Sequence, residues 1–323
     1  MTGGSDGTVV ACTSSLLVVF NTAIHACAAG GDWRLALDLL EELEGEGQRP
    51  DYYSFQAAMA ACQRAGEWER VLTLLQQMEA VGYPPDLASY DIVMSACIRA
   101  KSWARVPDIL VRMQQAGVRP DAHFIEAVMK ALAAEGQWAI SISVLDFLKK
   151  QGQQGQQGKK DNKDNKDNKD KDSNKDSNKD SNKDKHTHNK HTHTQNPLNN
   201  VVYNLAIKAC DSAPGGEWKA AVKLVEEMKT LGGKMLRPDL YSFNTAISAC
   251  QKAGQVTQIT RLLGRMEDLR VQPNTYTFIM ATSSCLQTPA FDKLFEVCSH
   301  THTYIHTHTH THTFTHTFTH TIT

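Results

Sequence analysis

The 323-residue chain has no apolar run of the roughly 18 residues that a membrane-spanning helix needs. It has almost no net charge, because its 34 Lys and Arg are balanced by 35 Asp and Glu. A global attraction to polyanions is therefore excluded, and any nucleic-acid binding must come from a local stripe. None of its eight cysteines forms a CxxC pair, and no glycine-rich phosphate loop follows a strand. No catalytic constellation emerges, so we do not expect an enzyme, a cofactor or a metal site.

The sequence does contain a repeat. Pro-Asp pairs end at Asp51, Asp86 and Asp121, so each follows the last by 35 residues. Cysteine and tryptophan keep the same spacing, at Cys27, Cys62 and Cys97 and at Trp33, Trp68, Trp103 and Trp138. The pattern returns at Phe243–Cys250 and at Phe278–Cys285. A fixed period of this length indicates a solenoid. Cysteines in one slot of a repeat are expected to be small buried residues of a reducing compartment rather than disulfide partners.

Each repeat is predicted to form two helices. In the second repeat Phe55, Ala58, Met59 and Cys62 lie at i, i+3, i+4 and i+7, after Ser54 as a plausible cap. A second stripe of helical spacing follows Gly66 and ends near Gly82. No segment alternates as a strand would. One helix pair cannot bury its stripe alone, so the fold class is all-α, a right-handed α-solenoid of antiparallel helix pairs.

The array is expected to have five parts. An N-terminal flank (1–16) precedes repeats one to four (17–151), a linker (152–197), repeats five to seven (198–298, the last partial) and a His-Thr tail (299–323). The fifth repeat is five residues too long, with extra residues around Pro214–Gly216 and Gly232–Lys234. The linker is rich in Lys, Asp, Asn and His and lacks large apolar residues until Leu198, so we expect disorder. Loop closure depends only logarithmically on length, so the stack can close behind it, although a split array is the alternative.

The two ends of the chain carry few targeting or metal-binding signals. Met1–Gly7 contains no Arg and carries an Asp, unlike an organellar transit peptide. Either the protein stays in the cytosol or a longer N-terminus exists. His-rich tracts can bind zinc or nickel. The simple His-Thr period of the tail nevertheless resembles expanded repetitive DNA more than a shaped metal site.

The repeat pattern resembles the pentatricopeptide repeat (PPR) family. The matching residues are Tyr/Phe-Asn-x-x-Ile, Ala-Cys, Ala-Gly, Leu-Leu-x-x-Met and Gly-x-x-Pro-Asp on a 35-residue period, over about 17–150 and 198–298. The Gly-Glu-Trp variant, at Gly66–Trp68 and Gly216–Trp218, resembles algal and protist repeats. The resemblance implies sequence-selective binding of single-stranded RNA, one base per repeat. It also implies a place in a chloroplast or mitochondrion.

In this family the fifth and the last residue of a repeat read the base. Carried over to this chain, the base-reading pairs are Asn21 with Asp51, Gln56 with Asp86, Asp91 with Asp121, Asn204 with Asp239, and Asn244 with Asn274. The three Asn-led pairs resemble pyrimidine readers. The third repeat departs from the pattern, since two ionised carboxylates only accept hydrogen bonds. The fourth has Glu126 with no partner, because the insert replaces it, and the seventh has Ile279.

Two further slots follow from the resemblance. The second residue of a repeat stacks beside bases, which implies base-stacking roles for Val18, Tyr53, Val201, Tyr241 and Tyr276. The residue two places after the repeated Cys contacts phosphate, which implies that role for Arg64, Arg99 and Lys252. The alternatives are a solvated surface cation for these three, and helix capping for Asn21, Asn204 and Asn244.

The sequence therefore favours an RNA-binding solenoid that acts by occupying a transcript, with a lean toward pyrimidines and other RNA-processing proteins as further partners. Some family members carry a metal-dependent nuclease after the repeats, but only His-Thr sequence follows residue 298 here. The runner-up is a protein-interaction scaffold without RNA affinity. A degenerate gene product is a third hypothesis.

Overall fold

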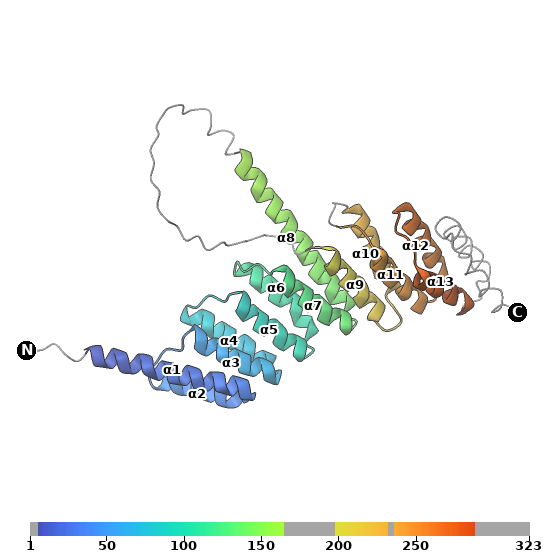
Figure 1. Ribbon diagram of the computed structural model, residues 1–323. Coiled ribbons are helices and arrows are strands. Elements are labelled where there is room, and N and C mark those ends of the chain that lie inside the picture. Colours follow the sequence, from blue (N-terminus) through green and yellow to red (C-terminus); the bar gives the residue numbers. More distant parts are fainter. Residues whose placement is uncertain (1–5, 165–197, 232–235, 288–323) are drawn as a thin grey trace, which may run out of the picture. The chain divides into compact units, whose positions relative to one another are not determined.

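The computed structural model describes residues 6–164, 198–231 and 236–287, and all regular structure within these ranges is helical (Figure 1). The predicted all-α solenoid of helix pairs is confirmed. By packing, the chain divides into two units, Met1–Val128 with Ser143–Leu198 and Met129–Ile142 with Asn199–Thr323. None of the described helices is long and apolar enough to cross a membrane.

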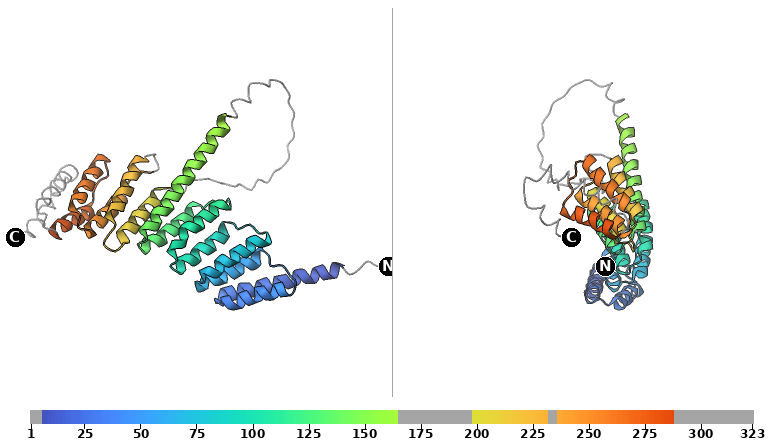
Figure 2. Two further views of the ribbon diagram at one scale, coloured as in Figure 1. Left: turned by 180° about the vertical axis from the view of Figure 1, so that it is seen from behind. Right: turned by 90° about the vertical axis from the view of Figure 1, so that its right-hand side faces the viewer.

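The first unit stacks the helix pairs of repeats one to three. They are α1 (Asp6–Gly30) with α2 (Trp33–Gly45), α3 (Tyr52–Ala65) with α4 (Trp68–Val81), and α5 (Leu87–Arg99) with the 3-10 turn η1 (Trp103–Arg105) and α6 (Val106–Gln115). Within this unit α1 packs on α3 and α3 on α5, while α2 and α4 each bridge two successive first helices. The first part of α1 projects past α2 (Figures 1 and 2). Helix α1 begins at Asp6, so part of the expected flank 1–16 is helical, and its end at residue 16 stays a prediction.

The fourth repeat supplies α7 (Ala122–Ala134) and α8 (Trp138–Asp164), each with residues in both units. The second unit continues with α9 (Asn200–Ser212) and α10 (Trp218–Thr230), α11 (Leu240–Lys252) and α12 (Val256–Asp268), and α13 (Thr275–Gln287). Here α9, α11 and α13 stack in chain order, and α10 and α12 each contact the first helices on either side. Both units therefore use the same packing scheme.

The first helices begin at the Pro-Asp pairs. Asp51 and Asp239 are N-caps whose carboxylates accept the backbone N–H of Ser54 and Ser242, and each serine hydroxyl accepts the N–H of its Asp in return. Such a capping box satisfies two donors that a helix start otherwise leaves unpaired. The expected cap at Ser54 is corrected: Asp51 is the cap, and Ser54 lies at the third helical position.

The repeated apolar slots form the core. The Leu or Met near the end of each second helix is buried, at Leu43, Met78, Met113, Leu148, Met228 and Met266. The repeated cysteines of the described region are free thiols, and all but the half-buried Cys27 are buried. Burial raises the pKa of the Cys62 thiol to about 11 and that of Cys250 to about 12. These thiols act as small apolar residues, as predicted.

The chain re-enters the repeat pattern at Asn199. Asn199 caps α9 by accepting the N–H of Val202, the role that Asp51 and Asp239 play elsewhere. Asn199 thus stands at the start of α9 where the last residue of a repeat stands at the start of α3 and α11, whereas the sequence predicted no residue in that slot.

Glycines at the ends of the first helices allow the next repeat to approach closely. Gly136 and Gly216 have positive φ, and a Cβ on them would lie 2.9 Å from Ser212 O and 2.6 Å from Ala249 O. Ser212 follows Cys210 by two residues, as Lys252 follows Cys250 and as Arg99, beside Gly66, follows Cys97. Within the second unit, α9 thus meets the Gly136 turn in the register that successive repeats use.

Only the first part of the expected linker lies within the described residues, and the expected tail lies outside them. Helix α8 continues to Asp164, so residues 152–164 of the expected disordered linker are helical, although Gly152, Gly155 and Gly158 are poor helix formers. The rest of the linker (165–197), the Gly232–Lys234 insertion and the chain after Gln287, with the end of repeat seven and the tail, lie outside the described residues.

Candidate nucleic-acid interface

The fifth residue of one repeat lies beside the last residue of that repeat at the start of the next first helix. The Asn21 amide donates to both carboxylate oxygens of Asp51, at 3.1 and 3.2 Å. The Asn204 amide does the same to Asp239, at 3.3 and 3.4 Å. Asn244 Nδ2 donates to Asn274 Oδ1 at 3.4 Å. The structure thus brings together these three predicted pairs, from α1 and α3, α9 and α11, and α11 and α13.

A hydroxyl from the next helix holds each of these amides. Ser54 Oγ lies 2.5 Å from Asn21 Oδ1, Ser242 Oγ lies 2.5 Å from Asn204 Oδ1, and Thr277 Oγ1 lies 2.6 Å from Asn244 Oδ1. All three hydroxyl residues are fully buried. The amide therefore has a fixed orientation, with its oxygen toward the hydroxyl and its nitrogen toward the last residue of the repeat. These hydroxyls were not identified from the sequence, although their shared slot at the third position of the following repeat is visible there.

The second repeat joins its pair through a tyrosine. Tyr52 donates its hydroxyl to Asp86 Oδ2 at 2.8 Å and accepts from Gln56 Nε2 at 3.2 Å, while Gln56 also donates to Ser89 Oγ at 2.7 Å. Burial, and then the bond to Asp86, raise the pKa of the Tyr52 phenol. Burial alone would raise the pKa of the Asp86 carboxyl, but hydrogen bonds from Ser89 and Tyr52 outweigh it and lower that pKa. Tyr52 is a member of the site that sequence reasoning did not select.

The third repeat is different. Asp91 and Asp121 are both exposed and no hydrogen bond joins them in the described structure. Asp121 caps α7 through the N–H of Phe124 at 2.7 Å, and Phe124 occupies the slot that holds a hydroxyl in the other pairs. This repeat presents two carboxylates and no amide.

The residues predicted to stack on bases are all exposed, namely Val18, Tyr53, Val201, Tyr241 and Tyr276. In the second unit, Tyr241 and Tyr276 are 52% and 57% exposed and line a cavity of ≈ 550 Å³ together with Asn244 and Asn274. Lys208 and Asp211 of α9 also line it. A cavity lined by an amide pair and two tyrosines suits a planar group that carries both donors and acceptors.

Comparison with known proteins agrees with this architecture. A model described as pentatricopeptide repeat-containing protein matches residues 18–148, and a pentatricopeptide repeat domain model matches 223–284, together more than half of the chain. The chain belongs to the pentatricopeptide repeat family.

Individual relatives are distant. A pentatricopeptide repeat-containing protein of Arabidopsis thaliana is 31% identical over 100 residues, which span 31% of this chain and 18% of the relative. The crystal structure of the pentatricopeptide repeat protein PPR10 from maize is 13% identical with a TM-score of 0.39, covering 89% of this chain and 38% of PPR10. PPR10 in complex with an 18-nt psaJ RNA element is 17% identical with a TM-score of 0.35, covering 95% of this chain and 44% of PPR10. The chain thus spans less than half the length of these relatives.

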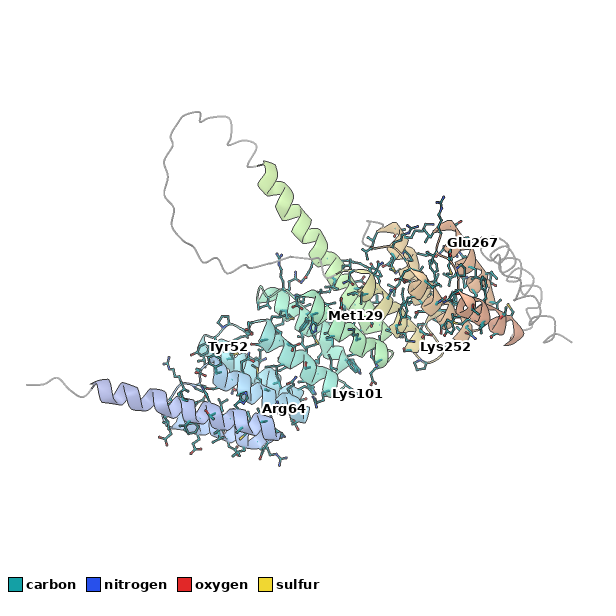
Figure 3. The ribbon with its side chains drawn as sticks, in the orientation of Figure 1. Tyr52, Arg64, Lys101, Met129, Lys252 and Glu267 are labelled. Atoms are coloured by element: carbon teal, nitrogen blue, oxygen red, sulfur yellow. The ribbon has the colours of Figure 1, made fainter. Side chains whose placement is uncertain are left out.

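Two of the three cations expected to contact phosphate in this PPR chain, Arg64 and Lys252, are bonded to the preceding repeat. Arg64, which lies on α3 (Figure 3), donates to the Ala28 carbonyl near the end of α1. Lys252, on α11, donates to the Asp211 carbonyl at 2.6 Å and to its carboxylate at 2.8 Å. Arg99 passes the Gly66 turn, with its Cδ 4.0 Å from where a Gly66 Cβ would lie. Cations near a helix C-terminus stabilise its unpaired carbonyls. A contact of any of the three with phosphate stays a prediction.

No group of three or more His, Cys, Asp or Glu in the described part of the PPR chain is arranged to hold a metal ion. The chemistry available along the first helices is thus hydrogen bonding by amides and carboxylates, stacking by tyrosines and charge pairing by lysine and arginine. This set is suited to binding, and the geometry most favourable for a ligand is the cavity of the second unit.

Proposed function

We propose that this PPR chain binds single-stranded RNA in a sequence-selective manner, with the fifth and last residues of its repeats as base readers. The observation that carries the proposal is the cavity of the second unit, which is lined by the hydrogen-bonded pair Asn244 and Asn274 together with Tyr241 and Tyr276. Tyrosine rings stack on any base, and carboxamides pair with Watson–Crick edges. Another protein of the family, PPR10, forms a complex with an 18-nt RNA element, which supports the same ligand class.

The proposed readers are the five pairs at the fifth and last positions, and the Asn-led pairs give the preference for pyrimidines. Asn244 keeps one N–H and one oxygen lone pair after the bonds described, because an amide has two of each. Asn21 and Asn204 keep the same groups when one N–H is shared between the two oxygens of the Asp carboxylate. A base can therefore form hydrogen bonds with the amide while the bonds to the hydroxyl and to the last residue of the repeat remain. The Asp91 and Asp121 pair contributes least, since its carboxylates repel phosphate and offer no donor.

The biological role that suits such binding is occupancy of an organellar transcript, in a chloroplast or mitochondrion, where the protein would protect an end, block a structure or expose a site to other RNA-processing proteins. These assignments come from the family rather than from side chains of this chain. The organelle and the effect on the transcript both depend on which RNA is bound.

A scaffold that binds proteins is the second candidate, and the third repeat favours it. Asp91 on α5 and Asp121, the cap of α7, place two exposed carboxylates in one base-reading pair, close to where an RNA strand would run. Acidic readers weaken polyanion binding and suit a basic peptide.

Fluorescence anisotropy with labelled poly-U, poly-C, poly-A and a duplex tests the proposal, repeated across salt because phosphate contacts make affinity fall as salt rises. We expect binding to the two pyrimidine strands, weaker binding to poly-A and to the duplex, and a further loss with Asn204→Ala. No binding of any strand at moderate salt would reject RNA binding and leave the scaffold.

A further inference from the structure

A cluster of three charged residues lies at the end of α9 beside the cavity of the second unit. Asp211 is 2% exposed, and its carboxylate accepts from Lys208 Nζ at 2.6 Å, from Lys252 Nζ at 2.8 Å and from Ser248 Oγ at 2.7 Å. Lys208 and Lys252 are partly exposed. Two ammonium groups thus share one buried carboxylate.

This arrangement leaves a net positive charge. Burial opposes ionisation of Asp211, but the hydrogen bonds from Lys208, Lys252 and Ser248 outweigh it and lower the pKa of the carboxyl. The hydrogen bond to Asp211 raises the pKa of Lys208. At neutral pH two cations therefore face one anion. Without Lys252, Asp211 would neutralise Lys208; with it, the cluster keeps about one positive charge.

The charge lies at the cavity rather than elsewhere on the surface. Lys208 and Asp211 line the same cavity as Tyr241, Asn244 and Tyr276. Lys208 follows Asn204 by one helical turn on α9. Lys252 does not line the cavity and uses two of its three N–H donors on Asp211. Lys208 makes a single such bond, which leaves donors for a ligand.

The sequence register shows that this cluster is specific to repeat five. The position of Asp211 is held in the other described repeats by Ala28, Gln63, Ile98, Ala133, Gln251 and Leu286, none of which is acidic. Lys252 stands in the slot that Arg64 and Arg99 hold in other repeats, so the feature particular to repeat five is the buried acid Asp211. Its effect here is to hold the Lys208 ammonium at the wall of the cavity.

We infer that Lys208 is the phosphate-binding residue of the cavity, for the phosphate group of a nucleotide whose base lies between Tyr241 and Tyr276. Asp211 and Lys252 are positioning residues that fix the Lys208 ammonium and preserve its charge. The inference rests on the proposed function, deepens it, and places the phosphate contact of this region on Lys208 rather than on Lys252.

The first test compares Lys208→Met with Lys223→Met in anisotropy titrations of oligo(U) and oligo(C) across salt. Lys223 is a matched control, since it is 77% exposed on α10 with only a 3.9 Å pairing to Glu227. We expect Lys208→Met to lower the affinity for both strands alike, by about three- to tenfold. The slope of log affinity against log salt should become shallower by about 0.7, the value for one phosphate on a single strand. Lys223→Met should change neither. Equal behaviour of the two variants would overturn the inference while leaving RNA binding intact.

The second test needs no RNA strand. Titrations of the full chain with cytidine monophosphate and with cytidine, followed by NMR shifts of the cavity residues, measure the phosphate contribution directly. The wild type and Lys223→Met should prefer the monophosphate, and Lys208→Met should bind both ligands equally. Absence of a monophosphate preference in the wild type would also overturn the inference. If the wild type binds no RNA strand, the proposed function fails, and this titration still decides whether the cavity accepts a phosphate.

Discussion

The Ser242 hydroxyl lies 2.5 Å from the amide oxygen of Asn204, on the preceding repeat. The same contact joins Ser54 to Asn21 and Thr277 to Asn244. Where the fifth residue is the carboxylate of Asp91, the slot instead holds the buried Phe124. The third residue of a repeat is therefore matched to the fifth residue of the repeat before it: a hydroxyl accompanies an amide.

Replacing Ser242 with Ala should reduce base selectivity more than total affinity. Without the hydroxyl, only the bonds to Asp239 hold the Asn204 amide, so the orientation that it presents to the base is less well fixed. A net hydrogen bond is worth about 0.5–1.5 kcal/mol, so the ratio of oligo(U) to oligo(C) affinity should move toward unity by about that amount. Ser242→Thr should behave as wild type, since Thr277 occupies this slot naturally.

A capping variant separates this effect from helix stability. Asp32 caps α2 by accepting the N–H of Leu35 and contacts no reader amide. Asp32→Ala should lower the midpoint of thermal unfolding with selectivity unchanged. If Ser242→Ala keeps the wild-type selectivity ratio, the hydroxyl acts only as a cap.

Tyr276→Ala should weaken binding of every single strand by about 1–3 kcal/mol, because base–aromatic stacking does not depend on the base. Tyr276→Phe should retain most of that affinity, since the ring remains. Val111→Ala, at an exposed residue of α6, provides the control and should have no effect on anisotropy titrations. Equal affinity of Tyr276→Ala and wild type would remove Tyr276 from the site.

Asp91→Asn should strengthen RNA binding. The change removes a carboxylate from the third repeat and creates an Asn–Asp pair like Asn21 with Asp51. The gain should be about 0.5–1.5 kcal/mol, the net value of one hydrogen bond, and should favour oligo(U). A basic peptide partner of a scaffold would instead be weakened by the same variant, so titrations with both ligands distinguish the two functions.

Asp211→Asn should destabilise the second unit at neutral pH. Hydrogen bonds to charged groups contribute about 1.5–3 kcal/mol, but the two lysines are partly exposed and regain water, so a loss of about 1–3 kcal/mol is expected. The folded pKa of Asp211 lies below its ordinary value of 3.8, so its contribution is present above that pH and disappears as pH falls through the folded pKa. Urea unfolding at several pH values should show the wild type and the variant converging in acid. A constant difference would mean that the carboxylate charge is not the cause.

Arg270→Gly should stabilise the chain. Arg270 has φ +56° after α12, at a place where repeats one to three have Gly47, Gly82 and Gly117, all with positive φ. A side chain in the left-handed region costs about 1–2 kcal/mol, which glycine avoids, although its greater freedom when unfolded returns part of the gain. We expect a net increase of about 0.5–1 kcal/mol in the free energy of unfolding. Gly117→Ala should change stability in the opposite direction.

Much of the fold could be predicted from one period. Pro-Asp, Cys, Trp and Gly at fixed spacing located the helix pairs, because capping, burial and chain reversal each require a particular residue type at a particular place. The boundaries at Asp6 and Asp164 were missed, since helix continuation depends on weak propensities that leave no apolar stripe to detect. Asn199 was missed because Leu198 separates it from Pro197, so no Pro-Asp pair marks it.

The order of residues along the chain is enough to define the repeat, its helices and the register of the reader positions, because these follow from local chemistry that recurs every 35 residues. Which side chains meet across repeats depends on the packed fold. The contacts of Ser242 with Asn204, of Tyr52 with Asp86 and of Lys252 with Asp211 join residues more than thirty positions apart. Which side chains meet depends on how far each first helix is shifted along its neighbour, and helix packing determines that shift.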